Sequence, residues 1–545
     1  AATRVNADGN IEKETQNLLT HSNTFNVSWS NGGTLTSGQS GYDGTNTAWL
    51  FATTSSGSYI AKGQGVSGVQ TFSLYAKAGT ADGVALRLIG GSNPYVYYDL
   101  SGDGAIAGGG GSASKIATDI TLVGNGWYRC SISTADATSS VRIYCATSSG
   151  DFAAGNIYIQ DAQLEQGLVA RDYIETTTAA VEGGITDNVP RLDYTDSSCP
   201  ALLLEPQRTN LVNHSEYYGG GDWARTRCGV ASNTSETLSP EGVYNASKMT
   251  STNVSESYAQ DDMLVSGSIS TWSFFAKKGD LDYCHGLVWD RSDDGCRQWF
   301  NLNTGAVGST QTFGSGYSVS SASIEDFGSG WYRCTMVVSG NSNANNGYRI
   351  SLSDSDSSTT SAVNSYGYFY GTQCEAGSYA TSYIPTYGTS VTRNAESNYV
   401  LSATDLIGQE QGSIFIAIGE KNTESIGVFE MGQGSSQHRF FVYIDTNNKL
   451  KVLVVDNYAV QVTYTSSVNV TSGAKIAVTY AENDYGIYLN GSLLHTDTSA
   501  SVPPMNQLAI GADRGRVVGA TANINKVLLF KTKLSNQEAI DLTTI

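Results

Sequence analysis

One set of sequence phrases occurs twice in the first two thirds of this chain, in the same order. Four phrases of the first copy begin at Asn17, Thr71, Gly126 and Gln163, and they return at Asn210, Thr271, Gly330 and Gln373. The copies are separated by about 200 residues, which is the length of a whole domain with its linker and far too long for a solenoid unit. The repeat therefore predicts two tandem copies of one domain. Two copies of a binding surface on one chain gain avidity.

Composition indicates that these domains are built from strands. The chain has 545 residues, enough for about three domains by the usual length per domain. Gly is abundant, at 60 residues, and Pro is scarce, at 8. Short runs of β-branched and aromatic residues alternate with turn-forming residues, and long amphipathic helical stretches are almost absent. This pattern is typical of all-β sandwiches.

The formal net charge of −19 bears on the partners of the chain. It disfavours nucleic-acid backbones and anionic membranes, and it leaves neutral sugars and cations. No apolar run approaches the roughly 20 residues that span a bilayer, so we expect no membrane insertion. The chain does not begin with Met, and we expect it to be a processed or partial product.

The predicted layout has six parts. Residues 1–16 are an adaptor, 17–176 the first repeat, 177–209 a linker and connector, 210–386 the second repeat, 387–397 a linker and 398–545 a different domain. In the last domain, 439–444 with 450–455 and 475–480 with 486–490 are expected as hairpins. Ser535 and Glu538 form a capping box, which predicts a short closing helix over 536–542.

The order of motifs in the last domain resembles the concanavalin A-like, laminin-G-like sandwich. The phrases are 475–480, then Tyr488-Leu489-Asn490-Gly491, then Leu508-Ala509-Ile510-Gly511, and finally 524–530 with Ser535 and Glu538. The resemblance covers about 150 residues, the size of one domain. It implies a concanavalin A-like sandwich for this domain, so that the expected fold class is all-β, with the two repeats as tandem jelly-roll sandwiches before it. Such domains commonly bind glycans or proteins, and some bind calcium.

A second resemblance concerns the segments around the repeats. The phrases are Ala2-Thr3-Arg4-Val5-Asn6 with Gly9-Asn10-Ile11-Glu12, Pro190-Arg191-Leu192-Asp193-Tyr194, and the run 202–211. Together they resemble bacteriophage tail-fibre and receptor-binding proteins that carry carbohydrate-binding-module-like jelly rolls. In those proteins the first two phrases lie close together before a single module. Here a whole module separates them, which is what a duplication would produce.

Candidate glycan-binding residues lie on predicted hairpins. Sugar sites need flat aromatic faces for stacking, and planar amides or carboxylates for hydroxyl pairs. Tyr95 and Tyr97 share one face of a strand because strand side chains alternate. Trp289, Asp290 and Arg291 surround the corresponding hairpin of the second repeat. The alternative is that these rings are half-buried sandwich residues, in a chain with 32 Tyr.

No metal or catalytic motif is evident. The five His lack a second His at ligand spacing, which argues against zinc. Asp290, Asp293 and Asp294 have the oxygen ligands that calcium prefers, although a solvated acidic loop is the simpler explanation. No phosphate-binding loop, dinucleotide fingerprint or nucleophile elbow is present. We therefore expect no certain cofactor, with calcium as the one candidate, and no catalytic residue.

The eight Cys allow two disulfides of one kind. If 127–133 and 141–146 fold as a hairpin, Cys130 falls nearly opposite Cys145, and Cys284 faces Cys296 in the same manner. Cross-strand positions of this kind approach bonding distance. The alternatives are Cys199 with Cys228 and Cys334 with Cys374, or free thiols buried in the sandwich cores.

These observations predict multivalent, non-catalytic recognition of a bacterial surface glycan by a phage virion appendage. The expected location is the virion tail or surface, facing outward, and the expected partners are other virion proteins and further copies of this chain, in a homo-oligomer with trimers favoured. One alternative is a polysaccharide depolymerase that uses the modules for targeting. Another is a structural capsid- or tail-associated protein.

Overall fold

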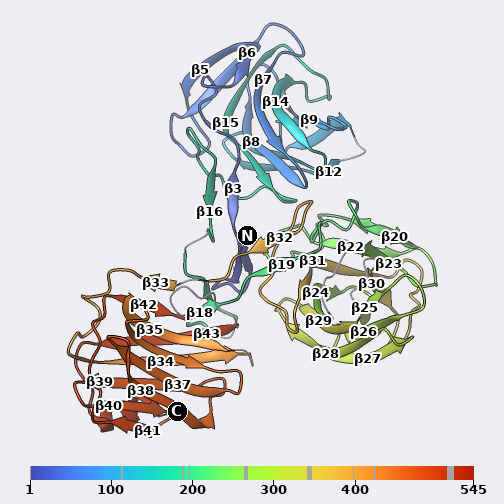
Figure 1. Ribbon diagram of the computed structural model, residues 1–545. Helices are drawn as coiled ribbons and strands as arrows, with labels where there is room; N and C mark the ends of the chain where they lie inside the picture. The colour runs from blue at the N-terminus through green and yellow to red at the C-terminus, as the bar shows by residue number, and fades with distance from the viewer. Residues whose placement is uncertain are drawn as a thin grey trace. The chain divides into compact units, whose positions relative to one another are not determined.

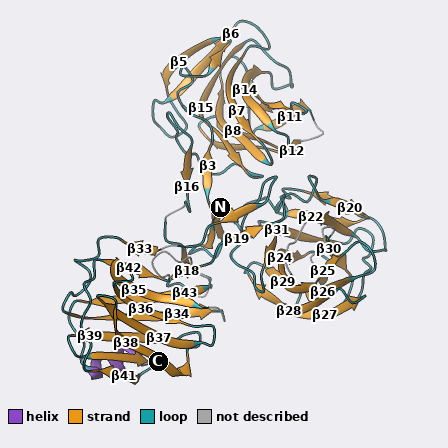
Figure 2. Cartoon of the chain, viewed as in Figure 1, coloured by secondary structure: helices purple, strands orange, loops and turns teal. Residues whose placement is uncertain are grey.

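The computed structural model describes residues 2–111, 115–186, 189–195, 197–262, 268–340, 346–396, 398–422, 425–511 and 521–544. Within these ranges strands dominate, and the short helix α1 (Asn536–Thr543) is the exception (Figure 2). The all-β class is thus confirmed. No helix in the described ranges is long and apolar enough to cross a bilayer. The chain divides into two units: unit 1 holds 13–186 and 209–391, and unit 2 holds 2–12, 187–208 and 392–545.

The first module of unit 1 is a sandwich of two six-stranded antiparallel sheets (Figure 1). Sheet A1 has the order β11 (Ala105–Gly110), β10 (Tyr95–Asp99), β9 (Gly83–Gly90), β14 (Thr138–Ala146), β7 (Tyr59–Val66), β4 (Ser30–Asn31). Sheet B1 has the order β12 (Lys115–Gly124), β13 (Trp127–Thr134), β8 (Gln70–Ala78), β15 (Gly155–Gln166), β6 (Ala48–Thr53), β5 (Thr34–Gln39). β3 (Thr15–Asn17) pairs with β16 (Val181–Gly183).

The second module repeats both sheets in the same strand order. Sheet A2 runs β27 (Ala306–Phe313), β26 (Gly295–Asn301), β25 (Tyr283–Trp289), β30 (Gly347–Ser353), β23 (Tyr258–Asp262), β20 (Ala224–Thr226). Sheet B2 runs β28 (Tyr317–Asp326), β29 (Trp331–Gly340), β24 (Ile269–Lys278), β31 (Tyr366–Ala376), β22 (Ser247–Ser251), β21 (Cys228–Ala231). β19 (Arg208–Asn210) pairs with β32 (Val391–Arg393).

The two modules also share the register in which their strands pair. Trp127 lies opposite Lys77, and Trp331 lies opposite Lys277. Both tryptophans are 1% exposed and are therefore buried.

The repeated phrases close each sandwich in the same way. The Asn17 amide donates to the carbonyls of Ala162 and Ile174, at 3.1 and 2.8 Å. Its counterpart Asn210 donates to Thr372 and Ile384 at the same two distances. Buried backbone carbonyls need such partners, so these phrases recur because the fold requires them.

Unit 2 has two facing sheets around one apolar core. The seven-stranded sheet runs β17 (Leu192–Asp193), β18 (Ala201–Leu204), β43 (Ala522–Phe530), β34 (Gln411–Lys421), β39 (Lys475–Ala481), β40 (Tyr485–Leu489), β41 (Ser492–Asp497). The six-stranded sheet runs β33 (Asn398–Val400), β42 (Gln507–Ile510), β35 (Ile426–Ser435), β36 (His438–Ile444), β37 (Lys449–Asp456), β38 (Ala459–Asn469). β1 (Thr3–Val5) pairs with β2 (Ile11–Lys13).

Both hairpins expected in the last domain form, and so does the capping box of α1. Residues expected in the connector, 201–204, are a full strand beside β43, and Leu204 is wholly buried in the core.

A buried ionic network in unit 2 joins three stretches that are distant in sequence. Arg191 donates to Glu205 at 2.7 Å, to Glu396 at 2.6 Å and to the carbonyl of Thr3 at 2.7 Å. Arg393 lies 2.8 Å from the same Glu205. Two guanidinium groups and two carboxylates balance each other, which a buried set requires. The phrases around Thr3, Arg191 and Glu205 thus contain residues that hold this unit together.

A second buried ionic cluster links the two modules of unit 1. Lys13 of the first module lies 2.9 Å from Glu216 and 2.7 Å from Glu241 of the second, and Arg171 also pairs with Glu241. The side chains of Lys13, Glu216 and Glu241 are 6%, 1% and 0% exposed. Burial opposes the charge on Lys13, but the two carboxylates outweigh it and raise the pKa of the ammonium group.

Lys13→Met should therefore destabilise unit 1 strongly. The substitution leaves the paired carboxylates of the second module with one cation instead of two, and an uncompensated buried charge costs about 3–5 kcal/mol. Denaturant unfolding at neutral pH measures the loss. Lys278→Met is the matched control, because its partner Asp282 is 45% exposed and such pairs contribute at most about 1 kcal/mol. Equal effects of the two substitutions would contradict the account.

Asp161 is a buried carboxylate at a backbone bulge of β15. Its φ of 56° lies in the left-handed region, and the Tyr42 hydroxyl donates to it at 3.0 Å. Burial raises the pKa of Asp161 to about 7. Between pH 4 and 7 the unfolded chain ionises this group while the folded chain keeps the proton. Stability should thus fall as pH rises through that window.

Asp161→Asn should remove this pH dependence. Asn tolerates the left-handed conformation and still offers Tyr42 an acceptor oxygen. We expect the variant to match the wild type at pH 4 and to exceed its unfolding free energy at pH 8 by on the order of 2 kcal/mol. Denaturant unfolding at both pH values tests this. A stability difference that does not change with pH would show that the pKa of the Asp161 carboxyl is not raised in the folded protein.

Candidate functional site

The outer face of sheet A1, directed away from sheet B1, carries an aromatic cluster. Strand alternation turns Val96 and Tyr98 into the core, so Tyr95 and Tyr97 point outward, and the prediction that these two share a face is confirmed. Their rings lie edge to face at 5.4 Å.

Three further rings, which sequence reasoning missed, complete this cluster. Phe152 lies 5.1 Å from Tyr97 and 4.6 Å from Tyr144, and Tyr144 lies 5.2 Å from Tyr59, measured between ring centroids. Tyr59, Tyr95 and Phe152 are half-buried, whereas Tyr97 and Tyr144 are 9% and 3% exposed. The face therefore presents ring edges and partial ring faces to solvent.

Two arginine side chains lie on this face. Arg142 of β14 lies over the Tyr59 ring at 4.2 Å, and Arg87 of β9 lies over the Tyr95 ring at 5.6 Å. Stacking on aromatic rings holds a guanidinium group in place and leaves its N–H donors at the edge. Together the arginines and tyrosines offer planar donors beside flat apolar surface, which is the chemistry that sugar recognition uses.

The equivalent face of sheet A2 keeps one part of this arrangement. Arg349 occupies the register position of Arg142 and lies 4.0 Å from the ring of Tyr258, the counterpart of Tyr59. Arg349 also lies 4.4 Å from the Trp289 ring. The position of Tyr97 is taken by Trp299, which is 1% exposed and donates to the Ser358 carbonyl at 2.7 Å.

The rest of the second face is polar and internally paired. Glu256 lies 3.1 Å from His285 and within 3.4 Å of both Arg297 and Arg349. Burial works against the charge on Glu256, but His285 and the arginines hold its pKa below the ordinary value. Burial also lowers the pKa of His285, so the ring is neutral near pH 7. One carboxylate thus serves both guanidinium groups of this cluster.

The sequence-predicted candidates of the second repeat separate in the structure. Trp289 is half-buried at the end of β25, and an added Cβ at Gly347 would lie 2.5 Å from its ring nitrogen. Asp290 accepts from the backbone of Ser292 and Asp294 in a turn. Arg291, with φ 65°, pairs with Asp262. Of these three candidates, Trp289 is the one that packs against Arg349 on the outer face of sheet A2.

The calcium candidates are not gathered into a site. Among the described residues, no three His, Cys, Asp or Glu side chains are placed to hold a metal ion. Asp290 caps its own turn, and Asp294 accepts from the Ser315 backbone at 2.9 Å. Backbone N–H groups thus take up the oxygens that a calcium ion would need.

The predicted disulfides are wrong in this structure, where all eight thiols are free. Strands β13 and β14 do not form a hairpin. They belong to opposite sheets, so Cys130 pairs with Leu74 and Ile120, whereas Cys145 pairs with Val84. In β25 and β26, which are neighbours, Cys284 lies opposite Phe300 and not Cys296.

The two further pairings are also absent: Cys334 is a buried free thiol, as is Cys374, while Cys228 is half-buried and Cys199 exposed.

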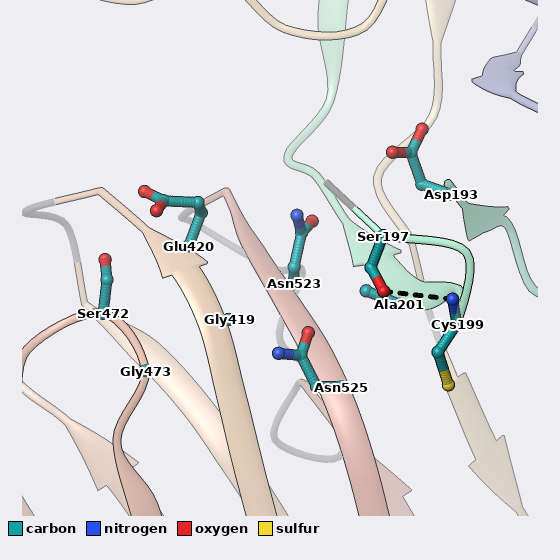
Figure 3. A pocket seen from close by; sticks show the side chains of 10 residues that line it. All are labelled: Asp193, Ser197, Cys199, Ala201, Gly419, Glu420, Ser472, Gly473, Asn523 and Asn525. Carbon is teal, nitrogen blue, oxygen red and sulfur yellow. Dashed lines mark hydrogen bonds between the residues drawn. The ribbon is translucent and has the colours of Figure 1, made fainter. Parts of the chain in front are cut away.

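Unit 2 contains a pocket of about 570 Å³ (Figure 3). Asn523 and Asn525 of β43 lie in its centre, with Glu420 and Ser472 on one side and Asp193, Ser197, Cys199 and Ala201 on the other. Gly419 forms part of the floor, where an added Cβ would lie 2.6 Å from the Asn525 amide oxygen. Two amides, a carboxylate and hydroxyl groups can grip a polyhydroxyl ligand. Asp193 is less available, because its oxygens accept from Val5 and Thr195.

Comparison with known proteins identifies the fold of unit 2. Residues 410–539 match the family model described as the concanavalin A-like lectin/glucanases superfamily. These residues form a concanavalin A-like domain. The expected resemblance is confirmed for this part of the chain, and nothing in the comparisons bears on phage origin. No curated protein matches the chain.

Several solved structures resemble part of the chain at low identity. The CBM40 of the Ruminococcus gnavus IT-sialidase, bound to α2,3-sialyllactose, is 19% identical, with 26% of this chain and 86% of that chain covered and a TM-score of 0.22. The native heptameric SAP-like pentraxin of Limulus polyphemus is 12% identical, with 26% and 72% covered and a TM-score of 0.22. The leech intramolecular trans-sialidase is 16% identical, with 27% and 26% covered and a TM-score of 0.24. Likenesses at these scores carry no argument about a ligand.

Thiol titration should separate the eight cysteines. We expect Cys199 to react first in the native protein, because it is exposed, and Cys228 to follow. The other six are buried, and burial raises the pKa of Cys145 and of Cys296 to about 12, which suppresses the reactive thiolate. Protein prepared without reductant should yield eight thiols in denaturant. A count of six thiols or fewer would show that at least one disulfide forms.

Proposed function

We propose that this chain is a non-catalytic glycan-binding protein of a phage virion appendage, and that it recognises a polysaccharide on the host surface. The observation that carries the proposal is the outer face of sheet A1, where Tyr59, Tyr95 and Phe152 present partly exposed rings beside Arg87 and Arg142. Flat rings beside fixed planar donors are suited to sugar rings and their hydroxyl pairs.

The domain content supports the same proposal. A concanavalin A-like domain, whose family description names lectins and glucanases, accompanies two sandwiches of one fold. Several weak sites on one chain, multiplied by copies of the chain, give tight attachment. The phrases around Arg4, Arg191 and Glu205 support the virion appendage, because they resemble phage tail-fibre and receptor-binding proteins. We further propose assembly into a homo-oligomer, a trimer by analogy with those fibres.

Binding without turnover follows from the kind of groups on the proposed face. The outer face of A1 contributes rings and guanidinium groups, which hold a sugar but supply neither a nucleophile nor a general acid. A glycosidase needs two carboxyl groups about 5–9 Å apart across the scissile bond. In unit 2, Asp193 is engaged by the backbone, which leaves Glu420 of the pocket carboxylates for such a role.

Tyr95→Ala should weaken glycan binding about fivefold, because one aromatic contact contributes about 1 kcal/mol. The ring is half-buried, so folding should survive. Surface-plasmon binding to polysaccharides from susceptible bacteria measures affinity, and thermal melting monitors the fold. Tyr244→Ala is the matched control, since that ring is 52% exposed elsewhere in unit 1. Unchanged affinity for Tyr95→Ala would remove this face from the site, and release of oligosaccharides by the wild type would contradict the non-catalytic function.

A further inference from the structure

The first module places two arginines directly opposite each other. In the antiparallel ladder of β9 and β14, Arg87 pairs with Arg142, and both side chains point to the outer face of sheet A1. Like charges at directly opposed positions of a sheet repel each other. This pair is unusual in a chain of net charge −19, where carboxylates outnumber the available cations.

Neither arginine of this pair has an ion-pair partner in the part of the chain that the structure describes. Among the described residues, no carboxylate forms an ion pair with Arg87 or Arg142, and the polar contact of Arg142 is the Tyr144 hydroxyl at 3.5 Å. The Nε atoms of both arginines are buried without a hydrogen-bond partner. Two guanidinium groups on one face without a carboxylate partner can therefore take an oxyanion from outside the chain.

In the second module, the arginines of the equivalent outer face have a carboxylate partner within the protein. At the position of Arg87 this module has Leu287, which pairs with Arg349 in the same register. Its arginines, Arg297 and Arg349, share the carboxylate of Glu256.

Glu256 stands two residues before Tyr258, and two residues before Tyr59 the first module has Gly57, which has no side chain. The first module therefore keeps two guanidinium groups and lacks the carboxylate.

We propose that the outer face of sheet A1 binds an acidic sugar, whose carboxylate or sulfate group lies between Arg87 and Arg142 while its ring packs against the neighbouring tyrosines. The planar guanidinium fork matches a carboxylate or sulfate oxyanion. Tyr59 and Tyr95, under the two arginines, hold these forks in place. The proposal rests on the proposed glycan binding and names the substrate class of that site. The outer face of sheet A2, with Glu256 built in, would not share this preference.

The substitution that tests this is Arg87→Leu, because Leu is the residue that the second module has there. It removes one arm of the oxyanion site and also the like-charge contact. We expect affinity for acidic polysaccharide to fall at least tenfold, with a melting temperature equal to or above that of the wild type. Arg225→Leu is the matched control, since it removes one exposed positive charge of the second module and should leave affinity unchanged.

The probes are uronic-acid-containing bacterial capsule polysaccharides, each beside its carboxyl-reduced form, together with sulfated polysaccharides and inorganic sulfate. The full chain should prefer the charged form of a polysaccharide over its neutral counterpart, and Arg87→Leu should abolish that preference. Preference for sulfated over carboxylated probes would identify the oxyanion as sulfate and support the site. Binding of inorganic sulfate alone would overturn the sugar part of the proposal.

Two results distinguish this inference from the proposed function. If the wild type binds charged and neutral forms equally, and Arg87→Leu binds as the wild type does, the acidic class is wrong while glycan binding stands. If the wild type binds no polysaccharide in either form, the proposed function itself fails. A fall in melting temperature for Arg87→Leu would show that Arg87 supports the fold, and this outcome would also count against the proposal.

Discussion

The buried contact of Lys13 with Glu216 and Glu241 is the interaction on which the rest of unit 1 depends. Each module is complete as a sandwich, with its own core. The module surfaces carrying these charges, however, are stable only when they meet, because neither the ammonium group nor the carboxylates can stay buried alone. Arg171 and the tyrosine hydroxyls around Glu216 complete the set.

Sequence repetition predicted the fold well because the repeated residues are those that the fold needs. Asn17 and Asn210 close their modules with matching hydrogen bonds, and Trp127 and Trp331 are buried in the same register. The capping box of α1 and the hairpins of unit 2 were predictable for a similar reason, since each depends on local residues alone. What recurs between the copies is therefore a guide to structure and not to ligand binding.

For the candidate site, the informative residues are those that differ between the two copies, not those that recur. The outer faces are distinguished by what differs between the copies: Arg87 against Leu287, and Gly57 against Glu256. An alignment of the two repeats could have revealed these positions, but only the strand register shows that Arg87 and Arg142 are neighbours. The disulfide prediction failed for the same kind of reason. The sequence predicts a hairpin for the consecutive strands β13 and β14, whereas the chain crosses from one sheet to the other between them.

The division of the chain into units has a consequence for how such proteins can change. Unit 2 is assembled from residues 2–12, 187–208 and 392–545, and the two modules lie in the intervals between these segments. The ends of the first module are tied by the β3–β16 pair, and those of the second by the β19–β32 pair. A domain whose first and last strands pair with each other has its two ends close together. It can therefore be replaced by another such domain without a change in the distance that the rest of the chain must span. Recombination at these pairs would replace one recognition surface by another while the Arg191 network stays intact.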